Sequence, residues 1–233
     1  MLENTINKIK NLNNGLKIVY FLLIVSNLYF YYLLIKNNVV SNLFANFSLD
    51  LLLWFVEVIL ITGLLTVIGI KIKGKRDKTT TTGILIYMLI FTVLGIFGSY
   101  FVVSSNAGGS INIRDAIMII GTISGGPIGG IGSGILAGIW RYSLGGVTAF
   151  SCTIATIIAP IIGSIIYYLN DKKITLTQSA ILMFLYMGLD MLIIILTTNI
   201  NEIYLITCEL YLPMLIGTVL SVVTYYLSIE FGK

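Results

Sequence analysis

Histidine is absent from this sequence, and charged residues are scarce. Only 10% of the 233 residues are charged, whereas an ordinary soluble domain carries about 25%. Without histidine, the chain offers no imidazole base, no phosphoaccepting histidine and no histidine metal ligand. The two cysteines, Cys152 and Cys208, lack the spacing of a metal site, and we interpret them as small apolar fillers. We therefore expect no metal and no cofactor.

Two further function classes are disfavoured by what is missing. The sequence has no Gly-x-Ser-x-Gly nucleophile turn, so no recognised reaction centre assembles and we expect the chain not to be an enzyme. The net charge of +4 does not indicate a nucleic-acid partner, because the basic residues cluster at the ends of apolar runs, where membrane topology explains them.

Long apolar runs dominate what is present. Hydrophobic residues make up 57% of the sequence, and a helix needs roughly 17 to 25 of them in a row to cross a bilayer. The connections between the runs are too short to bury a water-soluble core. The sequence thus predicts an all-α, polytopic helix bundle in the plasma membrane, with the lipid bilayer as partner and six clear spans at 18–35, 49–70, 83–103, 147–169, 174–197 and 203–228.

The first run follows a basic stretch, as a signal peptide would. It is long, however, rich in aromatic residues and without a small-residue cleavage site, so we interpret it as a retained signal anchor. We expect residues 1–48 to form this anchor helix and an outer loop, and residues 49–233 to form a multi-helix domain.

Basic residues predict the topology. Five of them crowd the segment 71–78, which the positive-inside rule places in the cytoplasm together with the N-terminus. The additional apolar stretch 114–140 is the open question. A single crossing there leaves nine basic residues inside and five outside, whereas a hairpin that enters and returns leaves eleven inside and three outside. The hairpin fits the rule better, and it places the C-terminus in the cytoplasm.

The stretch 114–140 also carries a break signal at its middle. Gly125 and Gly126 precede Pro127, and a proline at a first helical position favours a helix restart. Each arm would measure about 20 Å at 1.5 Å per residue, which is short of a full crossing. We therefore expect a glycine-rich broken or re-entrant helical hairpin. The spacing of Gly126, Gly130, Gly134 and Gly138 predicts a strip that another helix approaches closely.

Three blocks in the same region resemble a known family. The segments Asn112–Arg114, Gly125–Pro127 and Arg141–Cys152 read Asn-x-Arg, Gly-Gly-Pro and Arg-Tyr-x-x-Gly-Gly-x-Thr-Ala-x-x-Cys. In this order they resemble the five-transmembrane receptor region (5TMR-LYT) of LytS-type sensor histidine kinases and YhcK-type diguanylate cyclases. The likeness continues at Asp190–Met191, where the family tends to have Glu-Met, and in the last span at Leu212–Met214. It covers roughly residues 50 to 228.

The sequence also departs from the family pattern. Trp140 stands where the family commonly has histidine, Ala159 and Pro160 where it often has Glu-Gly, and Thr218 where asparagine is frequent. An intramembrane carboxylate is therefore lost. The 233 residues contain no kinase or cyclase domain, so we expect a separate cytoplasmic signalling protein, a kinase or cyclase, to provide the output.

The resemblance and the chemistry of the residues nominate a ligand site. Arginine is always charged and binds a carboxylate through two parallel hydrogen bonds, so we expect two arginines at the extracytoplasmic end to hold a small, anionic solute. Acidic residues within apolar runs are costly and usually functional. The candidate ligand-binding residues are Asn112, Arg114, Gly125, Gly126, Pro127, Arg141, Tyr142, Gly145, Gly146 and Thr148, and the intramembrane acids are Glu57, Asp190 and Glu209.

Two functions remain open at this point. The first is a receptor module for two-component or related signalling, which senses a small solute or the state of the envelope, as in cell wall regulation. The second is the substrate-binding membrane subunit of a small-solute transporter, because the family is similar in fold to such subunits of vitamin importers and because broken helices are typical of transport sites. A homo-oligomer is also left open, and the alternative role for the arginines is pairing with Asp115 or snorkelling to headgroups.

Overall fold

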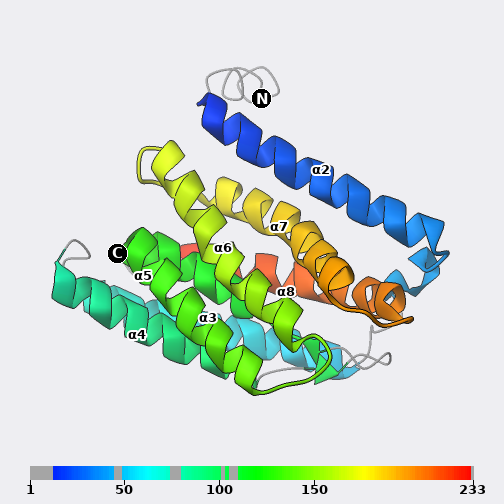
Figure 1. Ribbon diagram of the computed structural model, residues 1–233. Helices are drawn as coiled ribbons and strands as arrows, with labels where there is room; N and C mark the ends of the chain where they lie inside the picture. The colour runs from blue at the N-terminus through cyan, green and yellow to red at the C-terminus, as the bar shows by residue number, and fades with distance from the viewer. Residues whose placement is uncertain (1–12, 45–48, 74–79, 101–102, 105–109, 232–233) are drawn as a thin grey trace.

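The computed structural model describes residues 13–44, 49–73, 80–100, 103–104 and 110–231. These segments are almost entirely helical (Figure 1). The one sheet in this part of the chain is a pair of two-residue antiparallel strands, with Val103 opposite Ile111. In chain order the elements are α2 (Asn14–Lys36), η1 (Val40–Phe44), α3 (Leu49–Lys73), α4 (Thr81–Phe97), β1 (Val103–Ser104), β2 (Ser110–Ile111), α5 (Arg114–Ser143), α6 (Ala149–Leu169), α7 (Leu176–Thr197) and α8 (Ile203–Phe231).

Local capping explains where several helices begin. The Asn13 side chain accepts a hydrogen bond from the Gly15 amide at the start of α2, and Thr80 does the same for Gly83 at the start of α4. A reciprocal capping box of Thr175 and Gln178 starts α7. Each satisfies backbone donors that the first helical turn leaves without a partner.

Five described helices are long and apolar enough to cross a membrane: α2, α5, α6, α7 and the segment Ile203–Ser228 of α8. The chain is therefore a multi-pass membrane protein. Helix α4 has 17 residues and ends at Phe97, short of the expected end at residue 103, because the chain turns at residues 98–100. Helix α3 extends over the whole of the expected span at 49–70.

Helix α5 is broken at Gly126. This residue has φ 79° and ψ 173°, outside the helical region, in a conformation that is essentially restricted to glycine. It is also the residue at which the Gly-Gly-Pro sequence predicts a break. Helix α5 therefore consists of two arms, a first arm (Arg114–Gly125) and a second arm (Pro127–Ser143).

The two arms run in opposite directions along α4. On the first arm, Gly121 lies against Phe91 and Gly125 against Tyr87, so this arm is antiparallel to α4. On the second arm, Gly129 again lies near Tyr87, whereas Ala137 lies near Gly95, so this arm is parallel to α4. The arms also touch each other: a Cβ atom on Gly130 would lie 2.7 Å from the Cα atom of Thr122.

The strip of small residues on the second arm packs as its four-residue spacing predicts. A Cβ atom added to Gly134 would lie 2.5 Å from the Pro160 ring, and one added to Gly138 would lie 3.0 Å from Ile157. Both neighbours belong to α6, which has its closest packing with α5. Gly126 is the exception, because nothing lies within 4 Å of an added Cβ there. Its role is to adopt the backbone conformation that breaks the helix.

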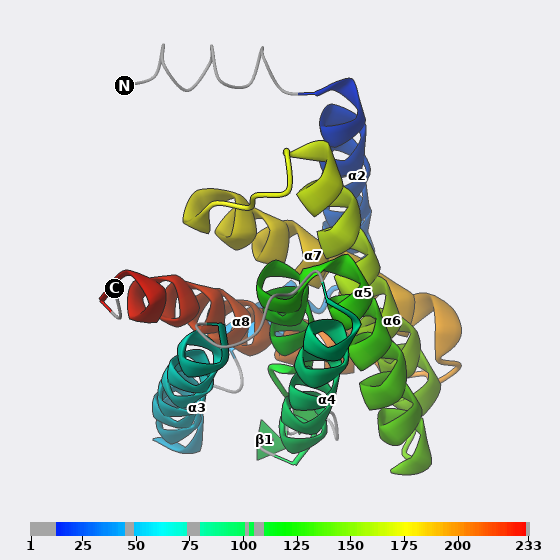
Figure 2. The same ribbon diagram turned by 90° about the vertical axis from the view of Figure 1, so that its left-hand side faces the viewer.

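Helix α2 lies along one side of the bundle beside α7, and α3 and α4 lie on the opposite side (Figures 1 and 2). Two side-chain hydrogen bonds hold α2 in place. The Asn27 side chain donates to the backbone oxygen of Leu185 at 2.5 Å, and Tyr31 bonds to the hydroxyl of Tyr211 at 2.9 Å. Most of α2 is nevertheless exposed, with large side chains such as Phe21 and Leu28 on its surface, as expected for a lipid-facing helix.

The bundle has two distinct ends. At the break end, Gly15 packs against Leu169, and Ser124, two residues before the break, bonds to Tyr225 near the end of α8. At the opposite end, α5 begins and ends, α6 begins and α7 ends, and Ser151 is hydrogen-bonded to Thr198 at 2.6 Å. We call this the cavity end, because it holds the cavity described below. Residues 74–78 of the basic segment 71–78 lie outside the described residues.

Candidate functional site

A cavity of about 450 Å³ opens at the cavity end of the bundle. Its polar lining comes from the turn after α4, strand β2 and the start of α5, the α5–α6 turn with the helix ends beside it, helix α7, and the loop before α8. Its apolar lining residues are Leu144, Val147, Ile194, Ile200, Ile206, Leu210 and Met214. The polar lining residues are Ser99, Ser110, Asn112, Arg114, Asp115, Arg141, Thr148, Cys152, Asp190 and Glu202.

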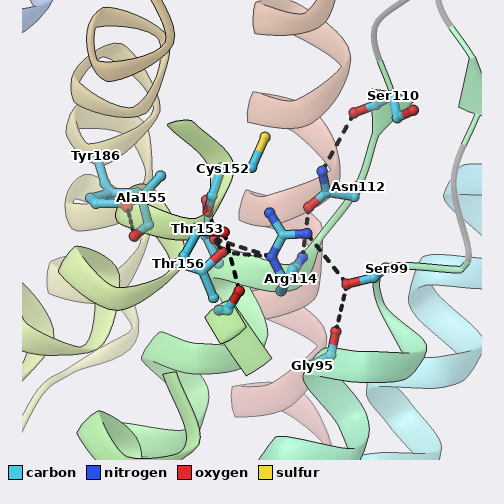
Figure 3. A network of polar contacts seen from close by, with 12 residues as sticks. Gly95, Ser99, Ser110, Asn112, Arg114, Cys152, Thr153, Ala155, Thr156 and Tyr186 are labelled. Atoms are coloured by element: carbon cyan, nitrogen blue, oxygen red, sulfur yellow. Dashed lines mark hydrogen bonds and ion pairs between the residues drawn. The ribbon is translucent and has the colours of Figure 1, made fainter. Parts of the chain in front are cut away.

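Asn112 fixes the start of α5. Its side-chain oxygen accepts a hydrogen bond from the Arg114 amide at 3.2 Å, and its side-chain nitrogen donates to the Ser110 carbonyl at 3.4 Å. Asn112 is buried, so these bonds satisfy a polar group that burial would otherwise penalise. The Asn-x-Arg block therefore positions the arginine through the backbone (Figure 3).

Arg114 is buried, with 2% of its surface exposed. Its Nε atom donates to the Thr156 hydroxyl at 2.6 Å, and Nη1 donates to Ser99 at 3.3 Å (Figure 3). Nε also lies 4.0 Å from the carboxylate of Asp115, to which Thr156 donates at 3.1 Å. Arg114 thus has its own buried counter-ion, and it still carries N–H groups that the described contacts do not use.

Arg141 stands in a more open setting at the end of the second arm. It is half-buried, and its Nη1 donates to the Gly145 carbonyl at 2.7 Å, with a longer contact of 3.5 Å from Nη2 to Thr148. Gly145 and Gly146 have φ values of 71° and 94°, which favour glycine and allow the tight turn from α5 into α6. This turn places Arg141 and Thr148 on one wall of the cavity.

Two acidic residues face the same space from the other side. Asp190 on α7 is buried, and Glu202 is exposed in the loop before α8. Both line the cavity. With the Arg114–Asp115 pair they give the cavity carboxylates as well as arginines.

The structure brings many of the predicted site residues together. Asn112, Arg114, Arg141, Gly145, Gly146, Thr148 and Asp190 all line the one cavity. Tyr142 does not, and its side chain is exposed. Gly125, Gly126 and Pro127 line a separate cavity of about 250 Å³ at the break end, with Tyr167, Tyr168 and Lys172. Thus the helix start at Pro127 does not contribute donors to the arginine cavity.

The other two intramembrane acids lie elsewhere. Glu57 is exposed on α3, and Glu209 is buried in α8 without lining the cavity. Five polar lining residues were not among the site candidates predicted from the sequence: Ser99, Ser110, Asp115, Cys152 and Glu202. Cys152, interpreted above as a filler, is a free thiol of intermediate exposure at the cavity wall. Within the described segments, no group of three or more metal-ligating side chains occurs.

Comparison with known proteins agrees with the three sequence blocks. The family model described as "5TMR of 5TMR-LYT" matches residues 66–229, which is more than half of the chain and contains every block. The match begins within α3, so the N-terminal helix α2 lies outside it. Among curated proteins and solved structures, none matches the chain. The resemblance seen in the sequence is thereby confirmed, and the chain belongs to the 5TMR-LYT family of membrane receptor regions of signalling proteins.

Proposed function

We propose that this protein perceives a small carboxylate-bearing solute in the cavity at Arg114 and Arg141 and passes that signal to a cytoplasmic kinase or cyclase. The observation that carries the proposal is the convergence of both arginines, from opposite ends of α5, on one cavity. Family membership supports the signalling role. The apolar remainder of the wall strengthens charged hydrogen bonds by lowering the local dielectric.

Arg141 is the better anchor for the solute. Arg114 is tied to Asp115, Thr156 and Ser99, so its charge is largely balanced within the protein. Arg141 has no carboxylate within 4.0 Å among the described residues and uses its guanidinium only on Gly145 and Thr148. An arginine has five N–H donors, which leaves it free to hold a carboxylate in a bidentate manner.

The proposal includes an orientation, with the cavity end outside and both termini in the cytoplasm. Lys172 and Lys173 lie at the break end, and Arg114 and Arg141 at the cavity end. Together with the counts of basic residues, this favours α5 as a re-entrant hairpin that does not cross the membrane. In a background without Cys152 and Cys208, Ser143→Cys should react with an impermeant maleimide on intact cells, whereas Asp171→Cys should react only after lysis. The opposite pattern would refute this orientation.

The ligand site is tested by titration calorimetry on the purified protein with a panel of small mono- and dicarboxylates. At least one should bind, and Arg141→Gln should weaken it roughly ten- to hundred-fold, since a charge-assisted contact is lost. Lys172→Gln is the matched control, because Lys172 is exposed at the break end. An equal loss of affinity in both variants, or no binding of any carboxylate by the wild-type protein, would refute the proposal.

Transport is the second candidate, and the break of α5 at Gly126 favours it, because discontinuous helices line many transport sites. Reconstituted vesicles separate the two functions. A receptor binds the solute without accumulating it, whereas a transport subunit gives saturable accumulation once an energising partner is added.

A further inference from the structure

Asp190 lies in the cavity without a partner of its own. It sits in the middle of α7 with 2% of its surface exposed, and it lines the cavity. In the part of the chain that the structure describes, no hydrogen bond and no ion pair reaches its carboxylate: the cation of Arg114 pairs with Asp115. A buried carboxylate without a donor is costly, and such groups are normally hydrogen-bonded.

Apart from the ion pair of Arg114 and Asp115, the cavity has a positive charge on one wall and a negative charge on another, which we call its two poles. Arg114 is the cation near two buried acids, Asp115 and Asp190, and its ion pair is with Asp115. What remains is Arg141 on the wall formed by the α5–α6 turn and Asp190 on the wall formed by α7, with Glu202 at the exposed rim. These two walls belong to elements far apart in the sequence. The cavity therefore offers a cation and an anion to its contents, and a simple anion would use only the first.

We propose that the cavity takes an amphoteric solute, whose carboxylate binds Arg141 and whose ammonium group binds Asp190. This inference rests on the proposed function and adds the ammonium pole to it. An ammonium group has three donors and forms strong, charge-assisted hydrogen bonds with a carboxylate. It supplies Asp190 with the donors that the protein does not. Ile194, Ile206 and Met214 line the remaining wall and suit the short apolar chain between the two charged groups.

Matched solutes test the second pole. Calorimetry compares three series, acetate with glycine and methylamine, butyrate with 4-aminobutyrate and butylamine, and hexanoate with 6-aminohexanoate and hexylamine. In one series at least, the amino acid should bind about tenfold or more tightly than the acid that lacks the amine. Asp190→Asn should remove that preference and leave the affinity for the plain acid within about threefold.

Two further variants make the result decisive. Asp190→Glu keeps the carboxylate and should keep a preference for the amino acid, so it serves if Asp190→Asn fails to fold. Asp171→Asn, an exposed position at the break end, should change nothing. Equal binding of acid and amino acid by the wild-type protein would overturn the inference while the proposed function stands. An equal weakening of both by Asp190→Asn would leave Asp190 a structural role and also overturn it.

The remaining outcomes separate the two proposals. If butylamine binds and butyrate does not, and Asp190→Asn abolishes that binding, the ammonium pole stands while the carboxylate site at Arg141 fails. If no member of the three series binds the wild-type protein, the amphoteric ligand class is refuted. Binding of another carboxylate in the wider panel would then show that the proposed function survives without it.

Discussion

The two arms of α5 are neighbours in sequence, but they are held by different means. In the first arm, the run Arg114–Thr122 is buried without interruption and includes large side chains such as Ile119. In the second arm, the buried residues are all Gly, Ala or Ser: Gly129, Gly130, Ser133, Gly134, Ala137 and Gly138. The large residues of this arm, such as Ile135 and Trp140, are exposed.

This difference shows two ways to place a charged residue in a membrane protein. The first arm is surrounded by protein on every side, so its arginine requires buried partners. The second arm offers small residues to α4, α6 and the first arm and turns its large residues outward, as membrane helices do where backbones approach closely. Its arginine stands at the arm's end, beside an exposed turn, and does not depend on packing.

The comparison predicts that substitution of Arg114 causes the largest loss of stability. Arg114→Gln leaves the Asp115 carboxylate without its cation in a buried site, which typically costs about 3 to 5 kcal/mol. Arg141→Gln removes only contacts to an exposed turn, and we expect a change within about 0.5 kcal/mol. Heating in detergent followed by size-exclusion chromatography should show that Arg114→Gln lowers the midpoint temperature of unfolding by roughly 6 to 20 °C. The midpoint temperature of Arg141→Gln should be nearly unchanged.

A double variant sharpens this test. Adding Asp115→Asn to Arg114→Gln removes the orphaned charge, so part of the lost stability should return, because replacing both members of a buried pair is often far less costly than removing one. Equal midpoints for the two single variants would show that burial does not distinguish the arginines. A double variant that is less stable than Arg114→Gln would show that Asp115 has another essential partner.

Local signals predicted the break and the glycine strip well. Gly125–Pro127 marks a position that only glycine can occupy comfortably, and the break occurs there at Gly126. The four-residue spacing from Gly126 to Gly138 predicted close packing, which holds at the last three glycines of the strip. These features depend on single residues and on the helical repeat, both of which are visible in the sequence.

The cavity was predicted less completely, since it depends on how helix ends converge. Glu202 and Ser99 belong to segments more than a hundred residues apart, and no spacing rule relates them; only packing brings both to one cavity. Asp115 was named only as an alternative partner of Arg114. Its signal was an acid inside an apolar run beside the arginine, but the sequence does not show that this side chain is buried with it.

A smaller loss of stability is expected when the packing of the second arm against α6 is disturbed. Alanine substitutions at two glycines, Gly134 and Gly163, measure it. A Cβ atom on Gly134 would lie 2.5 Å from the Pro160 ring and 3.0 Å from the Thr156 oxygen, neither of which is a flexible side-chain end. A Cβ atom on Gly163 meets its nearest neighbour at an ordinary 3.7 Å. Both glycines lie inside helices, so Gly→Ala brings each the same gain in helix propensity, up to about 1 kcal/mol.

The difference between the two variants therefore measures the close approach alone. We expect Gly134→Ala to be less stable than Gly163→Ala by about 1 to 3 kcal/mol, or roughly 2 to 12 °C in the same heating experiment. Gly138→Ala should fall between them, because its nearest neighbour at 3.0 Å is the side chain of Ile157, which has room to adjust. Since Thr156 also holds Arg114, Gly134→Ala should weaken solute binding as well. If all three variants are equally stable, the strip does not hold α5 to α6.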